Sequence, residues 1–324
     1  MPGARTDRPT GGPGTARIAV DLLGGDDAPA VVVDGALRAC GADPDLHLLL
    51  VGPGQVADEA IRALDPAERA RVAVRPTGGA VGMTDAPARA SRPDTTVRAA
   101  VAAVADGAAD GLVSAGASGA TVTATVLGLG RLPGVRRPPL AASLPGVAGP
   151  VVLLDVGASF EAKPATLARH AALGAAYAVV VHEIHAPRVG LLSIGTESGK
   201  GDRARRATEP VLACTRLPAD GRYVGLVEGY EPSLGKRADV VVTDGFTGNV
   251  LLKGIEGAYA MAGGESTAPR AAALLGVRGI SVICHGAAAA DDVASGIALA
   301  ALLHRRAAAA ALSALLSDLE PPHE

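Results

Sequence analysis

The sequence predicts an α/β protein with a mostly parallel, doubly wound sheet. Short apolar runs recur along the 324 residues, and each is followed by glycine or a small polar cluster. Nearly continuous runs of Val, Ile and Leu are typical of strands buried on both faces. Ala-rich segments of helical length, such as Val97–Ala105 and Ala165–Val181, lie between these runs. This alternation of strand and helix favours βαβ units.

The apolar runs place the predicted strands in order along the chain. They are Arg17–Leu23, Leu46–Val51, Arg71–Val74, Gly111–Val113, Val151–Leu154, Val189–Ile194, Tyr223–Val227, Asp239–Val242 and Ile280–Cys284. The Ala/Leu segment Val293–Leu316 predicts one long helix near the carboxy terminus that packs back on the first part of the chain.

Two lobes are expected. Leu140–Gly149 is the best candidate hinge because it contains Pro145 and two glycines, and a second crossing is expected around Gly263–Pro269. The first lobe would comprise residues 16–145 plus 275–318, and the second residues 146–274. Residues 1–15 are expected to form a disordered tail, and residues 319–324 a second tail.

Composition excludes several classes of protein. The net charge of −3 and an aromatic content of 2% argue against binding to nucleic acid. Cys40, Cys214 and Cys284 form neither a disulfide framework nor a CxxC pattern, which favours a reducing compartment. The first fifteen residues lack the apolar core of a signal peptide. Val293–Leu303 is shorter than the ~20 residues that cross a bilayer. A cytoplasmic protein is expected.

Polar, glycine-rich loops follow the predicted strands. In parallel sheets, ligands bind beyond the carboxyl ends of the strands, so we expect these loops to meet at one edge. The candidates from the first two loops are Asp21, Gly24, Gly25 and Asp26, then Ser114, Gly116, Ser118 and Gly119. Hydroxyls and glycines before a helix are suited to phosphate or an oxyanion. A turn of small residues with no ligand is the alternative for each single loop.

Lysine is rare in this chain. Of 30 basic residues only four are lysine, and Lys163, Lys200 and Lys253 lie in motif loops. A compact ammonium is useful against phosphate or a developing oxyanion. Solvated surface lysines are the alternative, and Lys236 fits that role. The histidines form no i, i+4 pair with a carboxylate, so no metal site is predicted.

Taken in order, these clusters resemble the PlsX family of bacterial phosphate acyltransferases. The stretches that carry the resemblance are RIAVDLLGGDDAP, DGLVSAGASGA, RPPLAASLP, LLDVGASFEAKP, PRVGLLSIGTESGKG, ADVVVTDGFTGNVLLK and LLGVRGISVICHG. The resemblance implies an isocitrate/isopropylmalate dehydrogenase-like and phosphotransacetylase-like fold with a cleft between two lobes. It implies a homodimer that transfers a fatty acyl group from acyl-acyl carrier protein to inorganic phosphate, giving acyl phosphate for phospholipid synthesis. It implies no metal or organic cofactor.

Several positions depart from the family's pattern. Asp27 replaces a usual histidine, Ala117 a usual asparagine and Ala287 a usual serine, while Tyr230 stands where an arginine is common. The stretch Gly257–Leu274 is much shorter than the family's helical insert, which is linked to dimer packing and membrane association. Because this stretch has few basic residues, we expect weak or no membrane association.

The candidate residues follow from the loops and from the resemblance together. The candidates for catalysis are Lys163, Lys200, Asn249 and His285. Those for substrate binding are Asp21, Gly24, Gly25, Asp26, Ser114, Gly116, Ser118, Gly119, Asp155, Gly157, Glu197, Glu228, Asp244, Gly245 and Gly248.

Phosphate attack on a thioester needs an anion site beside a carbonyl that becomes negative. Lys163, Lys200 and the loop N–H groups are the candidates for phosphate, Ser118 and Asn249 those for the carbonyl. His285 is a candidate proton donor. Two alternatives stay open: a relative that binds acyl carrier protein or acyl groups without turnover, and an NAD-dependent dehydrogenase of related fold. The dehydrogenase would need grouped metal-binding aspartates, a pattern that the sequence does not display.

Overall fold

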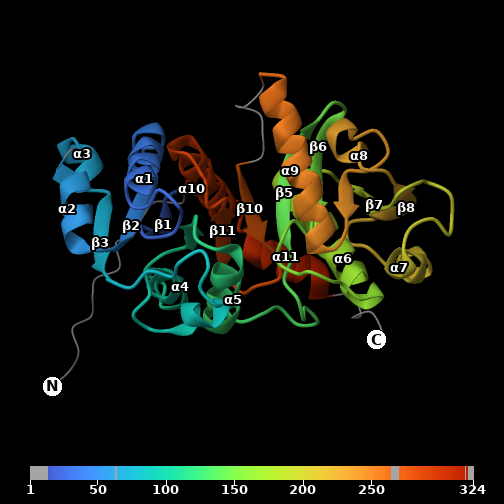
Figure 1. Cartoon of the computed structure of the whole chain (residues 1–324), viewed down its shortest axis with the longest axis horizontal. Helices are drawn as coiled ribbons and strands as arrows, with labels where there is room; N and C mark the ends of the chain where they lie inside the picture. Colours follow the sequence, from blue (N-terminus) through green and yellow to red (C-terminus); the bar gives the residue numbers. More distant parts are fainter. Residues whose placement is uncertain (1–13, 63, 264–269, 318, 320–324) are drawn as a thin grey trace.

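A computed structural model describes residues 14–62, 64–263, 270–317 and 319. These residues form an 11-stranded sheet with the order β3-β2-β1-β4-β11-β10-β5-β6-β9-β7-β8 and helices on both faces (Figure 1). The predicted α/β class with a mostly parallel sheet is confirmed. The two predicted tails, residues 1–15 and 319–324, fall largely outside the described residues.

The strands of the first half and the centre of the sheet alternate with helices along the chain. The strands are β1 (Ala16–Asp21), β2 (Leu46–Gly52), β3 (Val72–Pro76), β4 (Gly111–Ser114) and β5 (Leu140–Gly146). The helices are α1 (Ala30–Ala42), α2 (Gly54–Arg62), α3 (Pro66–Arg69), the 3₁₀ helix Pro87–Ser91, α4 (Thr96–Ala105) and α5 (Ser118–Leu129).

The rest of the chain builds the other half of the sheet and then returns to the first. The strands are β6 (Gly149–Leu154), β7 (Arg188–Leu192), β8 (Arg222–Val227), β9 (Val240–Val242), β10 (Ala271–Leu274) and β11 (Ile280–Cys284). The helices are α6 (Pro164–His182), α7 (Arg203–Cys214), α8 (Glu231–Leu234), α9 (Gly245–Met261), α10 (Ala290–Arg305) and α11 (Ala308–Ser317).

Strand direction reverses at the middle of the sheet. β10 is antiparallel to β11 and to β5, and β5 is antiparallel to β6. The parallel strands of the first half therefore point opposite to β6, β9, β7 and β8. The expectation that all glycine-rich loops share one edge is wrong, because the two sets of strands end at opposite edges.

Helices cover the two faces unequally. On one face, α1, α6, α10 and α11 pack on a single large core that includes Ile18, Leu154 and Val242. On the other face, α4 and α5 cover the first half, with Ala19 and Leu112 in that core. There α9 covers the second half through Leu252 and Ile255. The central strands on this face lie between α5 and α9.

Three sequence-based expectations need correction. The predicted hinge Leu140–Gly149 is strand β5 with the turn into β6, because its alternating residues pair on both sides of the strand. Val293–Leu316 is two helices, α10 and α11, which are bent by 56° at a break where Ala307 has a positive φ of 48°. β10 was not predicted, since Ala271–Leu274 is too short and Ala-rich to stand out as a strand.

Part of the predicted second crossing, residues 264–269, lies outside the described residues. The predicted boundaries of the two lobes stay a prediction.

In the part of the chain that the structure describes, no helix on its own has the length and hydropathy of a bilayer span. Among the described helices, α10 and α11 reach this length and hydropathy when they are taken together across their bend.

Candidate active site

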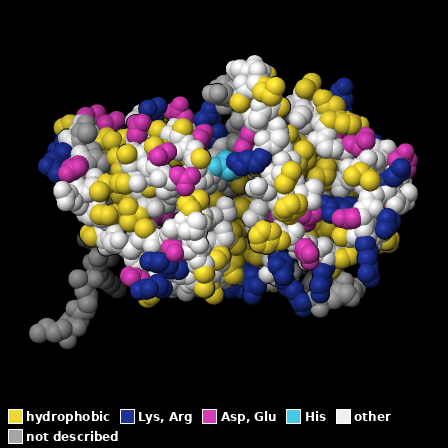
Figure 2. Space-filling view, in the orientation of Figure 1, with side chains coloured by type: hydrophobic (Ala, Val, Ile, Leu, Met, Phe, Trp, Pro, Cys, Tyr) yellow, Lys and Arg dark blue, Asp and Glu magenta, His cyan; other side chains and the backbone are white. Residues whose placement is uncertain are grey.

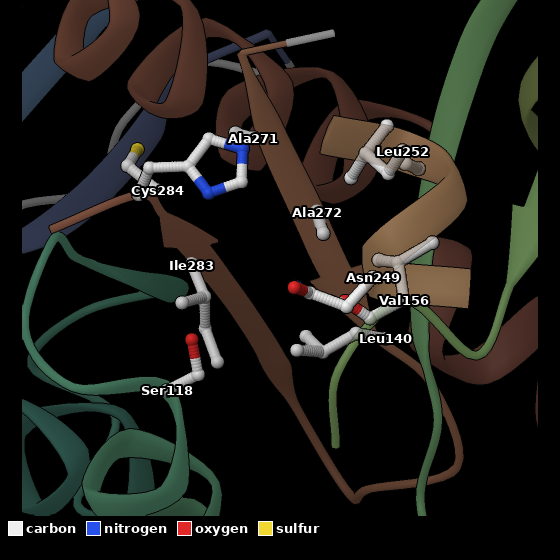
Figure 3. A pocket seen from close by; sticks show the side chains of 11 residues that line it. Ser118, Leu140, Val156, Asn249, Leu252, Ala271, Ala272, Ile283 and Cys284 are labelled. Carbon is white, nitrogen blue, oxygen red and sulfur yellow. The ribbon is translucent and has the colours of Figure 1, made fainter. Parts of the chain in front are cut away.

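A narrow cleft, here called the central cleft, lies over β5, β10 and β11 between the start of α5 and the side of α9 (Figure 3). Ser118 lines it from α5 and Asn249 from α9, on opposite sides of the cavity. The remaining lining residues are Leu140, Ala142, Val156, Leu252, Ala271, Ala272, Ile283, Cys284 and His285. The free space is about 30 Å³. Polar groups thus face each other across an apolar floor.

Asn249 is fixed by the loop that follows β6. Its Nδ2 donates a hydrogen bond to the carbonyl oxygen of Val156 over 3.0 Å, which leaves the second N–H of this amide for another acceptor. Gly157, with a φ of +143°, passes so close that an added Cβ would lie 3.2 Å from Asn249 Nδ2. The predicted residues Asn249 and Gly157 are therefore brought together at the cleft wall.

Two glycines let the start of α9 press against the same loop. A Cβ on Gly248 would lie 1.9 Å from the carbonyl oxygen of Asp155, and one on Gly245 would lie 2.2 Å from that of Ser159. Real Cβ atoms do not approach so closely, so any side chain here would push α9 away. Gly245 and Gly248 position the helix, and with it Asn249.

Asp155 holds the loop together and is fully buried. Its Oδ1 accepts hydrogen bonds from the backbone N–H groups of Leu140, Gly157 and Ala158 at 2.9–3.1 Å, and its Oδ2 accepts one from the Ser159 hydroxyl. With four donors around it, this carboxylate organises the cleft wall and does not reach into the cavity.

Asp244 caps α9 and pairs with a buried arginine. It accepts hydrogen bonds from the backbone N–H and hydroxyl of Thr247 and forms a salt bridge with Arg205. Burial alone would raise the pKa of Asp244, but the bonds from Thr247 and Arg205 outweigh it and hold this pKa below its ordinary value. Arg205 also bonds Asp202. No sequence pattern singles out Arg205, because it lies among several arginines in RARRAT.

Lys253, Glu256 and His285 form a closed triangle of contacts at one end of the cleft, here called the polar triangle. Lys253 Nζ lies 3.0 Å from His285 Nδ1 and 3.0 Å from Glu256 Oε2. His285 Nε2 lies 2.7 Å from Glu256 Oε1. Burial would raise the pKa of Glu256, but hydrogen bonds from His285 and Lys253 prevail and lower it. Because Lys253 and Glu256 come from α9 and His285 from the end of β11, the triangle joins the two sides of the cleft.

The loops of the first half form a second, separate cluster. Ser114 donates a hydrogen bond from its hydroxyl to the buried carboxyl of Asp21 over 2.7 Å and accepts one from the N–H of Gly116. Burial raises the pKa of Asp21, although bonds from Thr96, Ser114 and Leu23 oppose this. A Cβ on Gly24 would lie 2.8 Å from both Asp21 Oδ2 and Ser114 Oγ. These residues shape the turn before α5 and do not line the central cleft.

The start of α5 connects this cluster to the cleft. Ser118 is the first residue of α5, and the Ala117 side chain caps no N–H group. The first N–H groups of a helix have no partner within it and favour anions. Gly119 is exposed beside Pro87. The N–H of Asp26 bonds the carbonyl oxygen of Gly286, and Gly25 packs near the same oxygen, so these two tie the first loop to the end of β11.

The remaining predicted residues lie away from the cleft. Lys163, at the cap of α6, and Lys200 and Glu197, in the loop after β7, have exposed side chains and are not among the residues that line the cavity. Their roles stay predictions.

Glu228 accepts a hydrogen bond from the Tyr230 hydroxyl and lines a larger, mostly apolar hollow of about 710 Å³ on the opposite side of α9. Figure 2 shows exposed hydrophobic side chains on both halves of this face, and Ile194, Phe246 and Val250 are exposed members of the lining of this hollow.

Sequence reasoning missed Glu256. A Lys253-x-x-Glu256 spacing on one helix face was a usable signal, since i, i+3 residues are neighbours on a helix. Among the described residues, no group of three or more His, Cys, Asp or Glu side chains is placed to hold a metal ion. That no metal is needed stays a prediction.

Comparison with known sequences finds one family model, "Fatty acid synthesis protein", over residues 16–265. The chain is 38% identical over 317 residues to a phosphate acyltransferase of Desulfitobacterium hafniense strain Y51, covering 88% of this chain and 92% of that protein. It is 43% identical over 244 residues to a phosphate acyltransferase of Bacillus mycoides, covering 74% and 71%.

Solved structures share the fold at much lower identity. A phosphotransacetylase from Streptococcus pyogenes superposes with a TM-score of 0.62 at 16% identity, over 90% of this chain and 94% of that one. A branched-chain phosphotransacylase from Enterococcus faecalis V583 gives a TM-score of 0.62 at 15% identity, over 90% and 99%. At these identities the likeness concerns the fold alone.

Proposed function

We propose, for this chain of the PlsX family of fatty acid synthesis proteins, which is a phosphate acyltransferase, that acyl transfer takes place in the central cleft. In this proposal a fatty acyl group passes from acyl carrier protein to inorganic phosphate. The observation that supports this location for the reaction is the geometry of the cleft. It brings the start of α5 and the polar side of α9 to opposite walls over an apolar floor.

Phosphate binds, in this proposal, between the start of α5 and Lys253. The Ser118 hydroxyl and the first N–H groups of α5 offer donors at the positive end of a helix. Lys253 lies one turn beyond Asn249 on the same side of α9, and its side chain is 49% exposed. Two of its three N–H donors are used by His285 and Glu256, and the third is directed to phosphate.

Asn249 stabilises the thioester carbonyl oxygen as it becomes negative. Its amide is held by Val156, so the side chain is fixed in place before the substrate arrives. A positioned donor of this kind is worth roughly 3–4 kcal/mol in the transition state. Holding phosphate and thioester together supplies a further ~7–11 kcal/mol of the barrier.

The reaction balances without an external reagent. An oxygen of hydrogen phosphate forms a bond to the thioester carbon, the carbon–sulfur bond breaks, and the electron pair leaves with sulfur. The proton of hydrogen phosphate ends on the thiol of the carrier.

Assembly and location are part of the proposal. We expect a homodimer in the cytoplasm that meets its acyl donor through contact with the carrier protein and associates weakly or not at all with membranes. No nucleic acid, metal or organic cofactor enters the scheme.

The direct test is incubation of the protein with acyl-acyl carrier protein and labelled inorganic phosphate. We expect labelled acyl phosphate, with a rate that saturates in phosphate. If acyl phosphate forms from acyl-coenzyme A but not from acyl-acyl carrier protein, the acyl donor is acyl-coenzyme A. Labelled product from neither donor would refute the proposed reaction.

A further inference from the structure

The polar triangle of Lys253, Glu256 and His285 fixes the protonation pattern of its members. An ammonium group has donors only, so Lys253 Nζ must donate to His285 Nδ1 across their 3.0 Å contact. Nδ1 therefore carries no proton, and the proton of a neutral imidazole sits on Nε2, which donates to Glu256 Oε1 over 2.7 Å. Both ring nitrogens are engaged within the triangle.

This pattern changes the role open to His285. A histidine with both nitrogens occupied has neither a proton nor a lone pair to offer a substrate. His285 lines the cleft by its ring, but its polar atoms face Lys253 and Glu256. It is suited to hold its neighbours in place and not to protonate the leaving thiolate.

Glu256 is the member that contacts both others. One of its oxygens accepts from Lys253 and the other from His285, and its side chain is only 19% exposed. Lys253, with four side-chain torsions, is otherwise a flexible group at the rim of the cleft. A partly buried carboxylate at i+3 and an imidazole from the opposite wall together confine it to one position.

We propose that Glu256 is a positioning residue for the acyl transfer. It holds the Lys253 ammonium group near the reacting groups through a direct contact. It also fixes the His285 ring as the Nε2–H tautomer, and this ring holds Lys253 from the other side. The inference rests on the proposed function of the cleft. Glu256 contacts no substrate and acts only through Lys253 and His285.

Glu256→Gln gives a distinctive kinetic signature under this proposal. The substitution removes a negative charge beside a phosphate site, so electrostatic attraction for phosphate does not weaken. The orientation of Lys253 is lost, however, and orientation counts in the transition state. We expect kcat to fall at least tenfold while KM for phosphate stays the same or falls. Asp106→Asn is the matched control, since Asp106 sits in an exposed ion pair with Arg75 far from the cleft.

Two results would overturn the inference. One is a Glu256→Gln protein with a wild-type melting temperature and a kcat within twofold of wild type. The other is a rise in KM for phosphate with unchanged kcat, which would make Glu256 part of ground-state binding.

A second measurement needs neither turnover nor a folded variant. Nitrogen NMR of the wild-type protein at neutral pH reports which ring nitrogen of His285 carries the proton. We expect protonated Nε2 and unprotonated Nδ1. A protonated Nδ1 would overturn the inference even if acyl phosphate forms, and the expected tautomer would support it even if no acyl phosphate is detected.

Discussion

At the scale of single residues, the sequence and the structure differ on which lysine lies near the reacting groups. The sequence put Lys163 and Lys200 forward because they follow predicted strands, yet both side chains are exposed and outside the lining of the central cleft. Lys253 does not line the cavity either, but its ammonium group contacts His285, which does, and Glu256. The chain's sparing use of lysine was an informative signal, but it could not rank the lysines.

Lys253→Met should lower kcat at least tenfold, because a charge contact in the transition state worth ~1.4 kcal/mol already gives that factor. Lys200→Met, which removes the same charge from an exposed loop, should cause a smaller loss. Steady-state kinetics on both variants at saturating acyl donor decides between them. A larger loss of kcat in Lys200→Met than in Lys253→Met would instead indicate that phosphate binds at the loop after β7.

Gly248→Ala should destabilise the protein by roughly 1–3 kcal/mol, since the new Cβ would lie 1.9 Å from a backbone oxygen of Asp155. Gly254→Ala in the same helix is the control. A Cβ at Gly254 meets nothing within 4 Å, so the higher helix propensity of alanine should stabilise by about 0.5–1 kcal/mol. Urea unfolding of both variants measures the difference. Equal free energies of unfolding would show that α9 does not press on the loop as described.

At the scale of elements, the first turn of α9 carries much of the site. Asp244 caps it, Gly245 and Gly248 seat it on the loop after β6, and Asn249 faces the cleft. The sequence motif predicted these residues as one polar cluster. It could not show which of them support the helix and which face the cavity, because that depends on how α9 packs on its neighbours.

Asp244→Asn tests the buried ion pair at the start of α9. Asparagine is also a good cap, so the change removes the pairing with Arg205 more than the cap. Breaking such a pair costs roughly 3–5 kcal/mol at neutral pH. Since the pKa of Asp244 is lowered in the folded protein, its contribution is present above the ordinary carboxyl value of about 4 and is lost as pH falls through the lower folded value.

The measurement for Asp244 is the free energy of unfolding of wild type and variant from pH 7 to pH 3. We expect the gap between them to be widest at pH 7 and to narrow below pH ~4. A gap that stays constant across this range would contradict the ionised pairing of Asp244 with Arg205.

At the scale of the whole molecule, the reversal of strand direction determines where the site can be. The parallel runs of Val, Ile and Leu predicted most strands and the fold class, because buried parallel strands have a strong composition signal. β5 and β10 were missed, since one contains a proline and ends in a glycine and the other is three alanines and a leucine. These two strands form the antiparallel centre, and without them the sequence suggested a single loop-bearing edge.

The central claim is that the cleft between α5 and α9 is the site of acyl transfer. The most direct test is the rate of labelled acyl phosphate formation by wild type, Ser118→Ala and Asn249→Ala, with melting temperatures measured in parallel. The two side chains come from opposite walls and from opposite halves of the sheet. We predict at least a tenfold loss in each variant at a melting temperature close to that of wild type. Wild-type rates in both variants would contradict the account and place the reaction elsewhere on the molecule.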